Sequence, residues 1–351
     1  MPSNNHSFDH ATLIERSAEA LEHVGTPAAD ARLTARSLVV ADQRGIYSHG
    51  LLRLPLYVSA IQKGGINPRP DLRWHREHEA VAVLDADCGL GQVAMQAAVE
   101  RVKERATRYG VAVVAVQNSS HYGAGAFWSD QLVAAGMIAF ITSTTGPTVT
   151  PFGGTQSVLG TNPLTLALPS AGPNPLTADL ATSAGAYGKV LAARNEGKQI
   201  PNGWAIDQDG QPTNDPAAAI SGSLLAFGGH KGSAVAVLLE AFAATLGTSY
   251  FAHQTEDIWS NPSSRMNTGH FIIGIDTSCF TDRKHTEGRV AELQEAVRSA
   301  RGNGERIHAP GDIEYGNDAA NSKRVALSNS TVVQLNALYK ECGLDELSPL
   351  D

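Results

Sequence analysis

The chain is poor in cysteine. Only three of its 351 residues are cysteines, Cys88, Cys279 and Cys342, and no two of them form a CxxC pair. An odd number of widely spaced cysteines argues against both a disulfide framework and a zinc site, so we expect no metal. Residues 1–6 lack the basic and apolar regions of a signal peptide, which makes a reducing cytoplasm the expected location.

Long apolar runs and an excess of positive charge are also missing. No run is long enough to span a bilayer, and the formal net charge is -8, with no basic block interleaved with aromatic residues. We therefore expect neither a membrane nor a nucleic acid as a partner. With 42% hydrophobic and 18% charged residues, the chain can bury one large core or two smaller ones.

The first seventy residues have a helical pattern. Apolar residues recur at helical spacing from Leu13 to Val24, Gly25 ends the run, and Pro27 opens a second helix. A third helix is expected after Arg53. The Gly/Pro-rich stretch 63–70 then marks a candidate domain boundary.

Beyond this boundary the pattern alternates between strand and helix. Apolar strands at 80–84 and 111–116 flank an amphipathic helix at 91–109, which is an α/β unit. Further strands are expected at 138–141, 164–168 and 271–275, and long helices at 232–246 and 287–301. No internal repeat or low-complexity tract interrupts this pattern.

The segment Gly89-Leu90-Gly91-Gln92-Val93-Ala94 matches the G-x-G-x-x-G/A dinucleotide fingerprint. Two acidic residues just before it, Asp85 and Asp87, would oppose a pyrophosphate. The next strand ends in Gln117-Asn118, without the carboxylate that binds a ribose hydroxyl in that motif. We therefore interpret the glycines as a tight turn.

The segment from Ser48 to Arg53 places a hydroxyl, an imidazole and a fixed cation close together. His49 can act as a general acid or base, Ser48 can orient its ring, and Arg53 can hold a carboxylate by two parallel hydrogen bonds. Taken alone, a histidine between Ser and Gly is also typical of a turn. His121, which directly follows an expected strand, is a second acid–base candidate or a cap of a helix at 125–135.

Several loops have groups suited to a cofactor. Gly153, Gly154 and Gly160 allow close backbone approach, and Thr145, Thr161 and Asn162 offer uncharged hydrogen-bonding groups. Asp179 could accept from ribose hydroxyls or cap a helix. Lys231 combines a cation with the start of an apolar helix, a favourable place for phosphate.

Six ordered motifs resemble the malate/L-lactate dehydrogenase family of nicotinamide-dependent oxidoreductases. They are the 41–55 segment, Asn118 to Gly123, Pro151 to Gly154, Gly160 to Pro163, Asp179 to Ser183 and Gly228 to Gly232. The resemblance covers about residues 8–315. It is a family distinct from the Rossmann-fold lactate and malate dehydrogenases, and it includes ureidoglycolate and sulfolactate dehydrogenases, a diketogulonate reductase and reductases of cyclic imino acids.

The resemblance implies an α/β (α+β) fold with a non-Rossmann mixed-sheet nicotinamide-binding domain at 73–304. Residues 1–72 and 305–351 would form a helical domain. A homodimer is expected, and the cofactor would be NADPH or NADH, because no acid or arginine cluster can be assigned to the ribose 2'-position.

The resemblance also assigns roles to residues. His49, oriented by Ser48, is favoured for proton transfer. In some family members that role falls instead on the residue that matches His121. Substrate contacts would come from Arg53 and Thr161. Cofactor contacts are implied at His121, Tyr122, Gly123, Thr145, Asp179, Leu180, Ala181, Lys231, Gly311 and Asp312.

The expected chemistry is hydride transfer between nicotinamide and the carbon next to a small carboxylate. Lys189 favours a 2-oxo acid/2-hydroxy acid pair, because this chain resembles the hydroxy-acid dehydrogenases in having Gly-Lys there, whereas the imino-acid reductases have an aspartate at that position. The alternative is a cyclic imino-acid reductase of the piperideine-2-carboxylate or pyrroline-2-carboxylate type, to which the 225–234 segment is at least as similar. A non-catalytic nicotinamide-binding protein is the alternative from another class.

Overall fold

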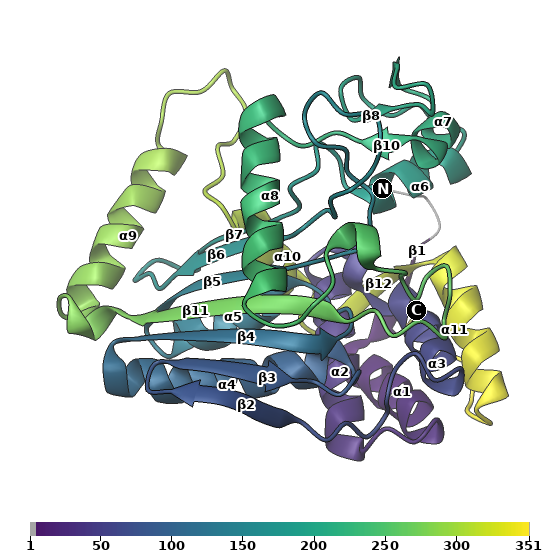
Figure 1. The fold of residues 1–351 in the computed structure, drawn as a ribbon, viewed down its shortest axis with the longest axis horizontal. Coiled ribbons are helices and arrows are strands. Elements are labelled where there is room, and N and C mark those ends of the chain that lie inside the picture. Colours follow the sequence, from purple (N-terminus) through teal and green to yellow (C-terminus); the bar gives the residue numbers. More distant parts are fainter. Residues whose placement is uncertain (1–4, 351) are drawn as a thin grey trace.

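A seven-stranded mixed sheet forms the centre of the computed structural model, which describes residues 5–350 (Figure 1). Its strand order is β2-β3-β4-β11-β5-β6-β7. The bounds are β2 (Arg73–His78), β3 (Val81–Asp85), β4 (Val111–Ser119), β5 (Met137–Ser143), β6 (Leu164–Leu168), β7 (Leu176–Leu180) and β11 (Thr268–Asp276).

Only the β3–β4 pair of this sheet is parallel, and α4 (Gly91–Tyr109) connects the two strands. The other neighbours, including β11 between β4 and β5, pair antiparallel. A Rossmann sheet is mostly parallel. The expected non-Rossmann α/β fold with a mixed sheet is therefore confirmed.

Helices cover both faces of the sheet (Figure 1). Helix α4 and α5 (Gly125–Ala134) pack on one face, where apolar side chains of β3, β4 and β5 form a core with Trp128 at its centre. Helix α8 (Gly229–Thr245) crosses the opposite face, and α9 (Arg283–Arg298) lies farther along that face. Every second residue of β4, namely Ala112, Val114 and Val116, is buried in this core, because successive side chains of a strand point to opposite faces.

The two ends of the chain share a second core. Helices α1 (His10–His23), α2 (Ala28–Gln43), α3 (Leu54–Gln62) and α11 (Asn329–Glu341) surround buried leucines and Tyr339. Strands β1 (Asn5–Asp9) and β12 (Arg324–Ser328) pair antiparallel and join the termini. Residues from elsewhere, such as Ile258 and Met266, also enter this core, and the expected division at residues 72 and 305 stays a prediction.

A third, smaller cluster lies within the 149–236 region, which the sequence did not separate. It contains α6 (Tyr187–Asn195), α7 (Pro216–Ser221) and a small sheet of β8 (Ala205–Ile206), β9 (Pro212–Thr213) and β10 (Ser223–Leu224). The remaining helix, α10 (Asp312–Ala320), packs on α2.

Helix starts were less well predicted than helix centres. Helix α9 begins four residues before the expected residue 287, because the side chain of Asp282 caps it by accepting from the His285 amide. Helix α8 begins at Gly229, not at residue 232. Within the described residues, no helix combines the length and the apolarity needed to cross a membrane.

Candidate active site

A buried carboxylate shapes the segment that carries His49. The segment consists of two short 3-10 turns, Tyr47–His49 and Leu51–Arg53, separated by Gly50. Asp42 on α2 accepts from the Leu51 amide at 2.7 Å. A Cβ at Gly50 would lie 2.0 Å from an Asp42 oxygen, so only glycine fits there. Burial raises the pKa of Asp42 to about 8.

The rejected glycine motif positions His121 instead. The Gly91 amide donates to the Ser120 hydroxyl at 3.0 Å, and that hydroxyl donates to the Gly89 carbonyl at 2.9 Å. A Cβ at Gly91 would lie 2.3 Å from the Ser120 carbonyl oxygen. The start of α4 is thus filled by the loop after β4, which agrees with the tight-turn interpretation.

The two candidate histidines face each other. The rings of His49 and His121 stack with centroids 5.4 Å apart and planes 20° apart. Ser48 Oγ lies 2.9 Å from His49 Nδ1, as its orienting role requires. On the other ring, the Tyr57 hydroxyl lies 2.6 Å from His121 Nδ1. Each imidazole therefore keeps its Nε2 free of these contacts.

Arg53, the cation of the 48–53 segment, lies beside the two histidines. Arg53 Nε donates to the Ser48 carbonyl at 2.8 Å, and the guanidinium lies 4.4 Å from the centre of the Trp259 ring. Among the described residues, neither terminal nitrogen of Arg53 has a carboxylate within salt-bridge distance. These two nitrogens form the fork that can bind a substrate carboxylate.

Both imidazoles are neutral at pH 7. Burial, and secondly the charge of Arg53, lowers the pKa of His49 to about 4. Burial, followed by the charges of His49 and Arg53, lowers the pKa of His121 well below its usual value. A neutral imidazole can accept a proton from an alcohol or donate a hydrogen bond to a carbonyl.

Two predicted hydroxyl contacts lie together near the rim of this site. The Thr161 amide donates to Thr145 Oγ1 at 2.9 Å. A Cβ at Gly160 would lie 2.2 Å from the same oxygen, so glycine is needed for this approach. Gly146, which follows Thr145 in the chain, packs against Asp257, and Asp257 lies two positions before Trp259. The Thr145 loop therefore adjoins the loop that covers Arg53.

Asp179 has a structural task. Its carboxylate accepts from the Ala126 amide and from Thr165 Oγ1, both at 2.8 Å, and so caps the start of α5. Burial raises its pKa. The sequence left open a ribose contact or the cap of a helix that follows Asp179. No helix begins there, because Asp179 lies in β7, and the ribose contact stays a prediction. Leu180 is 41% exposed and Ala181 is half-buried.

Lys231 lies in the first turn of α8, and its contact with a cofactor phosphate stays a prediction. Gly228 and Gly229 both have a φ of 61°, a left-handed conformation that turns the chain sharply into α8. The first amides of a helix have no partner within the helix, and Lys231 is exposed among them. The Phe152 amide donates to Ser233 Oγ at 2.9 Å, which fixes the 151–154 loop against this helix start.

The remaining predicted residues differ in their exposure to solvent. Gly188 lies against Ser48, with 3.1 Å between its virtual Cβ and that side chain, and the adjacent Lys189 is exposed at the start of α6. Tyr122 is buried, with an unpaired hydroxyl among the described residues, and Gly123 has a left-handed φ of 85°.

The turn at Gly311 leads into α10. Gly311 has a φ of 93°, and its virtual Cβ would lie 3.2 Å from the Thr177 carbonyl on β7. Asp312 pairs with Arg298 at 2.6 Å and accepts from the Ala309 amide at 2.9 Å. Its carboxylate is thus occupied by protein groups, and a cofactor contact at this turn stays a prediction for the backbone.

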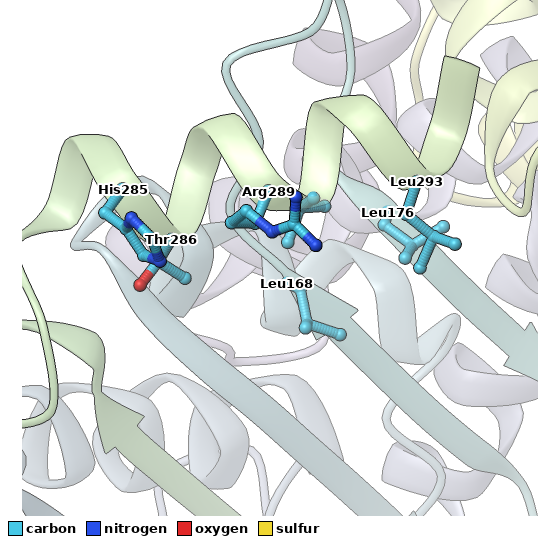
Figure 2. Close-up of a pocket in the computed structure, with 7 residues that line it drawn as sticks. Leu168, Leu176, His285, Thr286, Arg289 and Leu293 are labelled. Atoms are coloured by element: carbon cyan, nitrogen blue, oxygen red, sulfur yellow. The ribbon is translucent and has the colours of Figure 1, made fainter. Parts of the chain in front are cut away.

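A separate groove of about 410 Å³ runs between α9 and the ends of β6 and β7 (Figure 2). Leu168, Leu176, His285, Arg289 and Leu293 help to line it. None of these was a predicted site residue, and the groove lies at the opposite end of β6 from Thr161.

Comparison with known proteins agrees with the site. The family model described as malate/L-lactate dehydrogenase matches residues 8–336. The L-sulfolactate dehydrogenase of Methanocaldococcus jannaschii is 35% identical over 328 residues, covering 93% of this chain and 94% of that protein. A solved structure of the sulfolactate dehydrogenase from this organism has a TM-score of 0.91 at 34% identity, covering 97% and 98% of the two chains.

The chain belongs to the malate/L-lactate dehydrogenase family. It is 35% identical over 286 residues to the ureidoglycolate dehydrogenase (NAD(+)) of Escherichia coli, with 80% of this chain and 81% of that protein covered. A structure of delta1-piperideine-2-carboxylate reductase from Pseudomonas syringae pathovar tomato has a TM-score of 0.85 at 31% identity, covering 95% and 99%. This family member is an NAD(P)-dependent oxidoreductase.

Trp259 is one of the site residues that sequence reasoning missed in this dehydrogenase. Its ring meets His121 edge-on at 5.3 Å and lies under the Arg53 guanidinium. The available signal was an aromatic side chain inside the polar, turn-forming segment 256–264. Tyr57 and Gln92 were also missed. Tyr57 lies at the apolar spacing of a buried helix face, and Gln92 is a residue type common in helices, so neither position stood out as part of a site.

Trp259→Leu should raise KM for a small oxo acid about fivefold and change kcat little. The ring supports Arg53 by a cation–π contact, which contributes on the order of 1 kcal/mol when partly desolvated. Steady-state kinetics would measure this. The matched control is Trp74→Leu, which removes a similar contact to Arg101 at 4.3 Å on the outer strand. An equal rise in KM in both variants would contradict the assignment.

Proposed function

We propose that the protein interconverts a small 2-oxo acid and its 2-hydroxy acid, with NAD(P)(H) as cofactor. The observation that carries the proposal is the pairing of His49 with the open fork of Arg53, joined through Ser48. An acid–base group and a carboxylate-binding cation within one short segment fit a substrate whose reacting carbon is next to its carboxylate.

In this proposal the chain's own groups orient the substrate and move the proton. Arg53 holds the carboxylate by its two terminal nitrogens, and Thr161 is proposed to contact the substrate. His49 accepts the hydroxyl proton during oxidation and returns it during reduction. The substrate carboxylate offsets the charge of Arg53, which raises the pKa of His49 in the complex and favours proton transfer.

The cofactor is proposed to lie along the loops already described. Lys231 and the start of α8 suit a phosphate group, because an exposed cation and unpaired amides meet there. The backbone of Leu180 and Ala181, the 122–123 segment, Thr145 and the Gly311 turn are the further proposed contacts. A bound nicotinamide would supply or accept the hydride.

The alternative substrate is a cyclic imino acid. The similarity to the piperideine-2-carboxylate reductase favours it, whereas Lys189, which follows the Gly188 that lies against Ser48, favours the oxo acid. A cation near His49 lowers the basicity of the imidazole and can contact an oxyanion, while an aspartate there would raise that basicity. We place the oxo acid first for this reason.

The test compares NADH and NADPH oxidation with pyruvate, oxaloacetate and piperideine-2-carboxylate. Turnover of an oxo acid, lost in His49→Ala, is expected. The loss should be on the order of a hundredfold or more, because general acid–base catalysis contributes that much. Turnover of the imine alone would contradict the oxo-acid proposal and show that Lys189 does not discriminate.

The pH dependence should reflect the lowered pKa of His49. For oxidation of the hydroxy acid, the base must be neutral, so kcat/KM should stay level down to about pH 5. An imidazole with an ordinary pKa of about 6.5 would halve kcat/KM at about pH 6.5 and lower it roughly thirtyfold at about pH 5. The pH profile of kcat reports the pKa of His49 in the substrate complex. Because the substrate carboxylate raises that pKa, the fall of kcat on the acid side should begin at a higher pH than that of kcat/KM. A kcat/KM profile that breaks near pH 6.5 would contradict this account.

We also propose that a second copy of the chain covers the outer face of α8. Leu238, Phe242 and Leu246 form an apolar row at helical spacing, between 44% and 58% accessible, and the ring of Phe242 also stacks on Phe271 of the sheet. Leu238→Glu should shift the sedimentation coefficient from dimer to monomer. The control is Val333→Glu, an exposed apolar position on α11. A wild-type monomer, or an unchanged dimer in the first variant, would refute the proposal.

A further inference from the structure

Two wholly buried polar side chains stand behind His121 without touching the substrate side of the site. Tyr57 and Gln92 are both 0% exposed. The amide Nε2 of Gln92 donates to the Tyr57 hydroxyl at 3.1 Å, and that hydroxyl lies 2.6 Å from His121 Nδ1. Burying such groups is costly unless they are hydrogen-bonded, and Gln92 Oε1 has no partner among the described residues, so the amide is held by its donor side alone.

The direction of this chain follows from counting protons. A phenol has one proton to donate, and the Tyr57 oxygen already accepts from the Gln92 amide. Among the described residues, His121 Nδ1 is the one remaining partner of this hydroxyl, so the phenol proton is donated to Nδ1. Because the imidazole is neutral, its single proton then lies on Nε2.

We infer that Gln92 and Tyr57 are positioning residues that fix His121 as an Nε2–H hydrogen-bond donor to the substrate oxygen. This inference rests on the proposed function, in which His49 moves the proton. His121 would then hold the carbonyl oxygen and stabilise the negative charge that develops on it. The stacked arrangement of the rings, 5.4 Å apart, places both imidazoles beside the same reacting atoms.

Substitution of Gln92 by glutamate tests the direction of the chain. A carboxylate accepts hydrogen bonds, so Gln92→Glu would draw the Tyr57 proton away from His121. Tyr57 would then accept from His121 Nδ1–H, and Nε2 would be left as a bare acceptor. We expect kcat for oxo-acid reduction to fall about a hundredfold with KM within about twofold of wild type.

Tyr57→Phe and a matched control complete the kinetic test. Tyr57→Phe should lower kcat about tenfold to a hundredfold, because nothing then fixes the tautomer. Tyr339→Phe removes another buried phenol, which pairs with Ser17 at 3.1 Å in the core of the helices at the chain ends, and should leave kcat unchanged. Equal kcat in wild type, Gln92→Glu and Tyr57→Phe would overturn the inference.

A spectroscopic measurement needs no substrate and so separates this inference from the proposed function. The ¹⁵N chemical shifts of labelled histidines, assigned by the loss of signals in His121→Gln, report which ring nitrogen carries the proton. We expect a protonated Nε2 and a bare Nδ1 in the wild type, and the reverse in Gln92→Glu. A protonated Nδ1 in the wild type would overturn the inference even if the enzyme reduces oxo acids.

Discussion

The site depends on the contact between two imidazoles that come from different parts of the chain. His49 belongs to a loop between helices of the N-terminal segment, and His121 follows a central strand of the sheet. The two rings can stack only if the core of the terminal helices and the core of the sheet are held in a fixed position relative to each other. Asp42 beneath Gly50 and the glycine turn before α4 each hold one side of this contact. The same packing lowers the pKa of both rings, because it removes them from water.

Much of the fold could be predicted where one periodicity dominates. The helix at 91–109 and the strand at 164–168 have the predicted bounds, since apolar spacing is regular there and glycine or polar residues end each run. Strands β2 and β12 were not predicted. The sequence Arg-Trp-His-Arg-Glu-His of β2 is polar because this strand forms the exposed edge of the sheet. Its pairing with β3 comes from tertiary structure and not from its own pattern.

The candidate site was predictable where chemistry is concentrated in one segment. Ser48, His49 and Arg53 lie near one another as their spacing suggested, and the similarity to known dehydrogenases confirms the reaction class. Trp259 and Gln92 could not be found in this way, because long-range packing alone brings them to the histidines. Asp179 shows the opposite case: a residue suited to a ribose contact caps a helix 53 positions earlier in sequence.

The central claim is that His49 moves the proton while His121 holds the oxygen. Chemical rescue tests it most directly, in single turnovers of His49→Ala with saturating reduced cofactor and oxo acid. The account predicts that added imidazole restores hydride transfer in His49→Ala, because its protonated form, imidazolium, can replace the missing proton donor, and that it leaves His121→Ala unchanged. Rescue of His121→Ala with no effect on His49→Ala would exchange the two roles and contradict the account.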